Sequence, residues 1–350
     1  MITLMNNMPI TVFGASHEAF MGITIKNFPQ GIKINYTKIT EYLKRRTSFP
    51  YALSTRKEDD HFKVTSGVKD DITTGEDLTF IIENKDINPK PYEERKGIMR
   101  PSHADYVAWM KYKNPCLLGG GVFSGRMSAL YMILGALFDE LLNKQGIKVY
   151  ARLKSLKDIN DDASNIDYTK LDILFPVASS EAKSKMLSLL QNLHDDSVGG
   201  VIEICIKGLP AGLGEPIFGS LEASISQAMF AIPGIKGIEF GGGFAMTTKF
   251  GSEVNDQMKY QGNKLVFLTN YSGGIQGGLS NGEDLVFCLA VKPTPSIAKP
   301  QRTVDVINKT NVMLQIQGRH DKAFIMKAIH VASSMTSYAI YQILRGNDYE

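Results

Sequence analysis

Six short clusters of glycine or proline with polar residues contain the side chains in this sequence that are best suited to chemistry. Each places a histidine, arginine, lysine or hydroxyl where the backbone can approach a ligand closely. Three of the six histidines lie inside them. These residue types suit a site that binds phosphate and transfers protons. The clusters are Gly14-Ala15-Ser16-His17, Arg100-Pro101-Ser102-His103-Ala104-Asp105, 119–126, 272–282, Lys292-Pro293-Thr294-Pro295-Ser296 and Gly318-Arg319-His320-Asp321.

Two of the histidines stand out because both follow a serine directly. His17 and His103 share this Ser-His pattern, and an unperturbed histidine pKa of ~6.5 suits proton transfer near neutral pH. A lone histidine is more often structural. The sequence around His61, His194 and His330 is typical of loops or helix surfaces, so we assign them no role.

The arginines divide into two groups. Arg45 and Arg46 belong to a basic stretch that is most simply read as a solvated face. Arg100, Arg126 and Arg319 instead lie within the clusters. Because the guanidinium fork matches phosphate and carboxylate, several converging arginines would indicate a ligand with more than one negative charge.

Standard catalytic templates mostly fail. The sequence has no Gly-Lys dipeptide, which excludes a P-loop, and no HExxH zinc motif. Gly278 to Gly282 does match GxSxG, with Ser280 as the serine of a hydrolase. That elbow needs a strand before it and a helix after it, whereas here a glycine run precedes and a strand-like run follows. A serine hydrolase is therefore a weak alternative.

The order of expected elements favours an α+β fold. Residues 124–146 predict a helix that directly follows three glycines, so its N-terminus is a candidate phosphate seat. A second helix is expected from a cap at Thr37 to Arg46 and a third over 322–344. Residues 284–291 predict a short buried strand. Strands and helices alternate without a regular βαβ repeat, as in α+β layers.

Length and composition bound the function classes. The chain has 350 residues, a net charge of +3 and 43% apolar residues, enough for one large domain or two fused lobes and too weakly basic to indicate nucleic acid. Cys116, Cys205 and Cys288 are far apart, so neither a disulfide framework nor a metal site is indicated. We expect a cytoplasmic protein, because residues 1–7 lack signal-peptide character and the longest apolar run, 129–138, is too short for a membrane span.

Taken in order, the clusters resemble the chorismate synthase family. Its motifs are Gly-Glu-Ser-His-Gly, Arg-Pro-(Gly/Ser)-His-Ala-Asp, Gly-Gly-Gly-Arg-x-Ser-Ala-Arg, Gly-Gly-Ile-x-Gly-Gly-Ile-Ser-Asn-Gly, Lys-Pro-Thr-x-Ser and Gly-Arg-His-Asp. The resemblance spans about residues 9–345 and includes Leu209 to Phe218 and Lys236 to Gly241. Any one motif is weak, but six in the same order are specific.

The resemblance implies a fold, a reaction and partners. The fold would be a β-α-α-β sandwich, with helices between two antiparallel sheets, forming a single domain over residues 1–350 and assembling as a homotetramer. The activity would be a lyase reaction of the shikimate pathway, the anti-1,4-elimination of phosphate from 5-enolpyruvylshikimate 3-phosphate. It requires reduced FMN (FMNH2) as a transient electron donor without net redox change. No nicotinamide (NADP) fingerprint is visible, so we expect either an external flavin reductase as a partner or a strongly reducing cytoplasm to keep the flavin reduced.

The resemblance also assigns residues. His17 would protonate the leaving phosphate with Ser16 as a relay, His103 would meet the flavin, and Asp321 would help to receive the C6 proton. Arg46, Arg100 and Arg126 match substrate-binding arginines. The matching FMN contacts are Ser124, Gly277, Lys292, Pro293, Thr294, Pro295, Ser296 and Arg319, with Pro233 and Gly234 as weaker matches.

Several positions depart from the family pattern. Ala15 and Glu18 replace the glutamate and glycine that flank Ser-His, and Val122 and Phe123 replace an arginine and a small residue. Pro50 to Ala52 fall where an arginine is expected, and Ser333 where a glutamate is usual. A non-catalytic or repurposed flavin- or anion-binding relative is therefore the alternative to an active, divergent enzyme.

Overall fold

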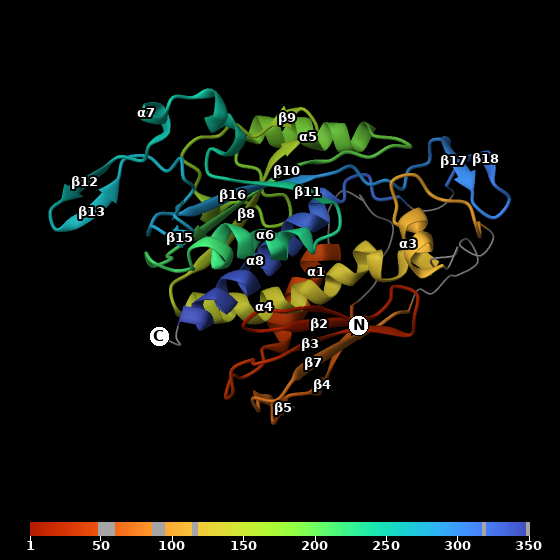
Figure 1. Cartoon of the computed structure of the whole chain (residues 1–350), viewed down its shortest axis with the longest axis horizontal. Coiled ribbons are helices and arrows are strands. Elements are labelled where there is room, and N and C mark those ends of the chain that lie inside the picture. The colour runs from red at the N-terminus through yellow and green to blue at the C-terminus, as the bar shows by residue number, and fades with distance from the viewer. Residues whose placement is uncertain (48–59, 86–94, 114–117, 317–319, 348–350) are drawn as a thin grey trace.

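The computed structural model describes residues 1–47, 60–85, 95–113, 118–316 and 320–347. Two five-stranded antiparallel sheets enclose a layer of helices (Figure 1). This arrangement confirms the predicted β-α-α-β sandwich. Residues 50–52, 116 and 319, on which some sequence predictions fall, lie outside the described residues.

The first sheet is built mainly from the N-terminal part of the chain. Its strand order is β1-β2-β3-β7-β4. The strands are β1 (Ile2–Leu4), β2 (Ile10–Gly14), β3 (Phe20–Ile25), β4 (Phe62–Ser66) and β7 (Leu78–Glu83).

The second sheet has the order β11-β16-β10-β8-β9. The predicted buried strand is β16, which lies between β11 and β10. Five of its seven residues are buried, Val286 is half-buried and Ala290 is exposed. The strands are β8 (Lys148–Leu156), β9 (Ile159–Asn160), β10 (Gly200–Lys207), β11 (Ile235–Phe240) and β16 (Leu285–Val291).

Four helices occupy the space between the sheets. α4 (Ala129–Lys144) and α8 (Ile325–Asn347) pack on each other, with α1 (Tyr36–Thr47) and α6 (Leu221–Phe230) beside them. α4 is apolar around most of its surface, as expected for a helix buried on several sides. A side chain at Gly135 would collide with Ser334, so this glycine permits the close approach of α4 and α8.

The remaining elements lie outside these layers (Figure 1). The helices are α3 (Asp105–Tyr112), α5 (Ser180–Asn192) and α7 (Gly251–Val254). The hairpins are β5–β6 (Val68–Lys69 and Ile72–Thr73), β12–β13 (Met258–Gln261 and Lys264–Phe267), β14–β15 (Ile275–Gln276 and Leu279–Ser280) and β17–β18 (Gln301–Asp305 and Thr310–Leu314).

Two predicted helix starts are wrong. Asn35, not Thr37, caps α1, since its side-chain oxygen accepts a hydrogen bond from the Lys38 N–H at 3.0 Å. The helix expected from Ser124 begins only at Ala129, after a 3₁₀ turn over Gly125–Ser128. The first two residues of α4, Ala129 and Leu130, are fully buried, and the phosphate seat at the junction after the three glycines stays a prediction.

His330 is also not on a helix surface, as the sequence suggested. It lies in α8 with only 7% of its surface exposed, and burial, with a further contribution from Arg45, lowers its pKa to about 3. A histidine that stays neutral in the fold but titrates near ~6.5 when unfolded favours the unfolded state as pH falls between those values.

We expect His330 to make the unfolding free energy fall more steeply as the pH is lowered. Replacing His330→Gln should flatten the decline of the unfolding free energy between pH 6.5 and pH 4 by up to ~1.4 kcal/mol per pH unit. Urea unfolding at several pH values measures the slope, with exposed His194→Gln as the control. Identical slopes for the parent and His330→Gln would show that His330 protonates as readily in the fold as in the unfolded chain.

Candidate active site

The Ser16–His17 pair lies in the five-residue loop that joins β2 to β3. Ser16 is fully buried and His17 half-buried, with its Nδ1 atom inside the protein. Asn84, directly after β7, donates its side-chain amide to the carbonyls of Ala15 at 3.0 Å and Glu18 at 2.8 Å. The loop is therefore held from a third strand of the same sheet.

The second cluster forms a tight turn before α3. Arg100 donates from Nε and Nη2 to the two carboxylate oxygens of Asp105, at 2.7 Å each, and Asp105 also accepts the Arg100 backbone N–H. Burial alone would raise the pKa of Asp105, but its hydrogen bonds and charge pairing with Arg100 lower it. The Arg100 guanidinium, which is predicted to bind substrate, thus already donates two hydrogen bonds to Asp105. A ligand would have to share this guanidinium with Asp105.

His103 lies in the same turn and follows Ser102, whose backbone has a left-handed conformation. Its Nδ1 is 2.9 Å from the Pro101 carbonyl, which can only accept, so the proton of the neutral ring sits on Nδ1 and Nε2 is left as an acceptor. Burial, and then the Arg100 cation, lower the pKa of His103 to about 4. His103 is therefore neutral at pH 7 in the ligand-free protein, with a pKa well below the unperturbed value assumed from the sequence.

Lys292 joins the second cluster to the fifth. At the end of β16 its amino group donates to the Ser102 carbonyl at 2.9 Å, and its backbone N–H donates to the Gly234 carbonyl, also at 2.9 Å. Burial and then the neighbouring Lys236 lower the pKa of Lys292. Three sequence-predicted positions, His103, Lys292 and Gly234, are thus adjacent in the structure.

The rest of the fifth cluster leads to the sixth. The Thr294 carbonyl accepts a hydrogen bond from Ser197 at 2.6 Å, while the Thr294 hydroxyl is buried and has no hydrogen-bond partner among the described residues. Ser296 Oγ lies 3.0 Å from His320 Nδ1. Pro293 is exposed and Pro295 half-buried beside them, whereas Arg319 lies outside the described residues.

Asp321 follows His320 and is paired with a residue that sequence reasoning missed. Lys327, in the first turn of α8, donates from Nζ to both carboxylate oxygens of Asp321, at 2.8 and 2.9 Å. Phe324, between the two, packs its ring near both Gly125 and Gly234. This ring connects the Lys292 cluster to the start of the α4 region.

Arg46 and Arg126 converge there on a buried carboxylate. Asp60, whose side chain is 1% exposed, forms ion pairs with Arg126 and, at 3.8 Å, with Arg46. Arg46 also donates to Ser128 Oγ and to the Gly125 carbonyl, and the Ser124 hydroxyl accepts from the Arg126 backbone N–H. Val122 and Phe123, the apolar departures from the family pattern, are exposed just before this turn.

Gly277 occupies the tip of the β14–β15 hairpin. Gly277 and Gly278 form a two-residue turn, and both have a positive φ, which glycine adopts easily. The space beside Gly277 is open. Ser280 of this hairpin is buried, donates to the Pro210 carbonyl and accepts from the Leu213 N–H. The serine-hydrolase reading is therefore wrong, since this hydroxyl is neither exposed nor on a strand-to-helix turn.

The structure brings together some predicted residues and leaves others apart. His103, Lys292, Gly234, Ser296 and the Asp321 region form one connected cluster. The backbone carbonyls of the His17 loop accept hydrogen bonds from Asn84, directly after β7, and the Gly277 hairpin forms hydrogen bonds with residues 210–221.

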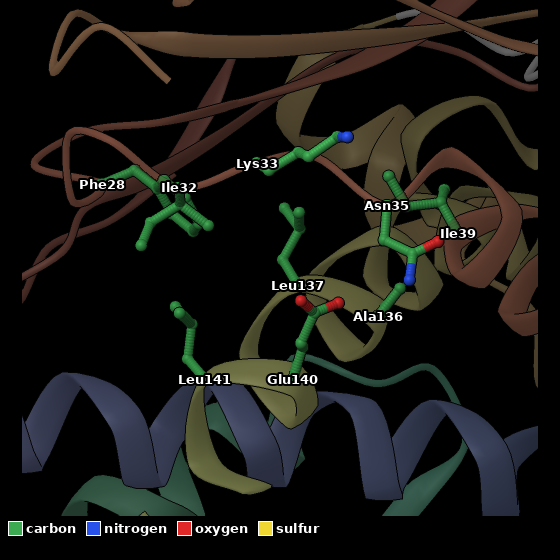
Figure 2. Close-up of a pocket in the computed structure, with 9 residues that line it drawn as sticks. All are labelled: Phe28, Ile32, Lys33, Asn35, Ile39, Ala136, Leu137, Glu140 and Leu141. Atoms are coloured by element: carbon green, nitrogen blue, oxygen red, sulfur yellow. The ribbon is translucent and has the colours of Figure 1, made fainter. Parts of the chain in front are cut away.

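A small pocket lies elsewhere and contains none of the predicted site residues. Figure 2 shows Leu137 and Leu141 of α4 facing Phe28 and Ile32 across it, with Lys33 and Glu140 nearby. Its lining offers one cation and no histidine or arginine. It lacks the groups that a phosphorylated ligand needs.

Comparisons with known proteins agree with the fold and the order of the clusters. A solved structure described as chorismate synthase superposes with a TM-score of 0.72 at 22% identity, covering 97% of this chain and 91% of its own. A chorismate synthase of Dehalococcoides mccartyi is 39% identical, over 93% of this chain and 92% of its own length. The chorismate synthase of Archaeoglobus fulgidus is 36% identical, over 95% of this chain and 93% of its own length. Residues 8–344 match the family model described as chorismate synthase, and the chain belongs to the chorismate synthase family.

Proposed function

We propose that this chain converts 5-enolpyruvylshikimate 3-phosphate to chorismate and inorganic phosphate, the last common step of aromatic amino-acid biosynthesis. The bond from C3 to the phosphate oxygen and the C6–H bond both break, and the ring gains a second double bond without net oxidation. The family match over residues 8–344 carries this assignment. Curated relatives that share the family name support the enzyme rather than a non-catalytic relative.

Reduced FMN is the proposed cofactor, and the residues present fit it. Lys292 offers a cation to the anionic cofactor beside His103, and the buried Thr294 hydroxyl still lacks a partner among the described residues. Ser124, Gly234 and Ser296 are the other proposed contacts near this cluster, and Gly277 the more distant one. Arg319, which lies outside the described residues, is proposed on the family resemblance alone. When bound, reduced FMN supplies an electron transiently to the substrate.

The protein's own residues would bind the substrate and move protons. The leaving phosphate needs a proton, which His17 is proposed to give, with the buried Ser16 hydroxyl beside it in the loop. His103 presents an unprotonated Nε2, so it can take up a proton when an anion binds nearby and raises its pKa. Asp321, whose two carboxylate oxygens accept hydrogen bonds from Lys327, is proposed to help to receive the C6 proton.

Arg46 and Arg126 are proposed to bind the anionic groups of the substrate. Both guanidinium groups lie close to Asp60, so their combined charge is partly neutralised before the substrate arrives. Arg100 is a weaker candidate, because Asp105 takes two of its donors.

Assembly and location are also proposals. Exposed apolar side chains around α7 and the projecting β12–β13 hairpin support a homo-oligomer, proposed as a tetramer (Figure 1); they include Phe244, Phe250, Met258, Tyr260 and Leu265. Among the described residues, none of the helices has both the length and the apolar character to span a bilayer. We propose a single-domain cytoplasmic enzyme whose flavin is reduced by an external reductase.

The test is phosphate release from 5-enolpyruvylshikimate 3-phosphate without oxygen, with and without photoreduced FMN. We expect release only when reduced FMN is supplied. FMN binding without any phosphate release would favour the non-catalytic alternative. Turnover of highly purified protein under air with NADPH and oxidised FMN would instead show that the chain reduces its own flavin.

A further inference from the structure

The side chain of Asn84 bridges the two ends of the turn that contains Ser16 and His17. Its amide nitrogen donates to the carbonyls of Ala15 and Glu18, one on each side of the pair, at 3.0 and 2.8 Å. The Asn84 backbone N–H adds a third bond, to the Ala19 carbonyl at 3.0 Å. Asn84 is 7% exposed, so these bonds do not compete with bulk water.

The orientation of this amide is fixed by its surroundings. Rotating it by 180° would place its oxygen against two carbonyl oxygens and lose both hydrogen bonds. In the orientation present, the Asn84 oxygen is buried and has no hydrogen-bond partner among the described residues. The desolvation cost of that oxygen is of the same order as the gain from two ordinary hydrogen bonds. Asn84 therefore contributes little net stability, and its effect is to fix the conformation of the turn.

The rest of the loop geometry depends on the same few contacts. Gly14 ends β2 with a positive φ, and a side chain there would collide with the Phe20 carbonyl. The Glu18 N–H donates to the Ala15 carbonyl at 3.2 Å and closes the turn. Asn84 reaches both carbonyls of this turn from β7, the strand that pairs with β3.

We propose that Asn84 is a positioning residue for the elimination, acting through His17. By holding the carbonyls on both sides of Ser16 and His17, it fixes the direction in which the imidazole is presented to the leaving phosphate. This inference rests on the proposed function, and in particular on His17 as the proton donor.

A double-mutant cycle tests the proposal. Asn84→Ala should lower kcat on the order of 10-fold to 100-fold, because a displacement of about 1 Å of a catalytic group costs that much. KM and FMN affinity should stay close to the parent values. In a His17→Ala background the same substitution should change kcat hardly at all, because the group that Asn84 positions is already gone.

The control is Asn6→Ala. The Asn6 amide donates to the Tyr338 hydroxyl at 2.7 Å, and its oxygen accepts from the Met8 N–H at 3.0 Å, so it also ties a loop to the core. Asn6 precedes β2, whereas the Ser16–His17 turn follows the opposite end of that strand. We expect a lower melting temperature and an unchanged kcat.

Each outcome separates the positioning role from the assigned chemistry. Equal kcat losses from Asn84→Ala in both backgrounds would overturn the proposal and leave His17 as the donor. Full activity of His17→Ala would overturn both. If Asn84→Ala does not fold, Asn84→Asp takes its place in the cycle, since it keeps the shape but replaces the donor by an oxygen that faces the two carbonyls.

Discussion

Replacing either His17 or His103 by alanine should lower turnover by roughly 10²–10⁴-fold while the protein still folds and binds FMN. Each substitution would remove one positioned proton-transfer group, and general acid–base catalysis contributes about that factor. The contacts proposed for FMN at Lys292, Thr294 and Ser296 would remain. Anaerobic phosphate release with reduced FMN measures the loss, and the exposed His194→Ala serves as the control.

The two variants should fail in different ways. His103 has a pKa of about 4 in the ligand-free protein, and an anion bound beside it would raise that pKa. FMN binding near pH 5.5 should therefore take up a proton in the parent and in His17→Ala, but take up less in His103→Ala. Calorimetric titration in buffers of different ionisation enthalpy measures this uptake. Parent-like turnover of both variants would refute the assigned mechanism, and equal proton uptake in all three proteins would refute the role of His103.

Elements whose sequence carries one strong pattern could be predicted. Apolar residues at helical spacing predicted α4, and a short, nearly all-apolar run predicted β16. The cap of α1 was misplaced because Asn35 and Thr37 are both good capping residues two positions apart. The start of α4 was misplaced because a 3₁₀ turn and an α-helix have similar side-chain patterns over four residues.

The site could be predicted only in part. Its candidate residues were visible as clusters, but their roles followed from a family resemblance rather than from spacing. The partners that hold them were missed because they are distant in sequence. Asp60 and Arg126 are 66 residues apart, and Asn84 reaches Ala15 across 69 residues. Burial decided the charge state of His103, and a single sequence does not show how deeply a turn is buried.

Asp60→Asn is expected to have the largest effect on stability. The substitution keeps the shape but leaves Arg46 and Arg126, both almost fully buried, without their shared negative charge. Removing one partner of a buried ion pair costs about 3–5 kcal/mol. Urea unfolding measures the loss. Glu181→Gln is the matched control, because the same chemical change in an exposed pair with Lys185 should cost less than ~1 kcal/mol.

The same variant should respond more strongly than the parent to an added anion. In the parent, Asp60 already neutralises part of the charge of the two arginines, so an incoming phosphate competes with it. In Asp60→Asn the arginines lose the charge of that carboxylate, and inorganic phosphate or the substrate would supply a negative charge in the fold only, which raises the unfolding free energy by linkage. Phosphate should therefore recover a larger share of the stability in Asp60→Asn than it adds to the parent or to Glu181→Gln. If phosphate stabilises all three proteins equally, Arg46 and Arg126 do not face the anionic ligand, and their charges serve only to hold α1, Asp60 and the start of α4 together.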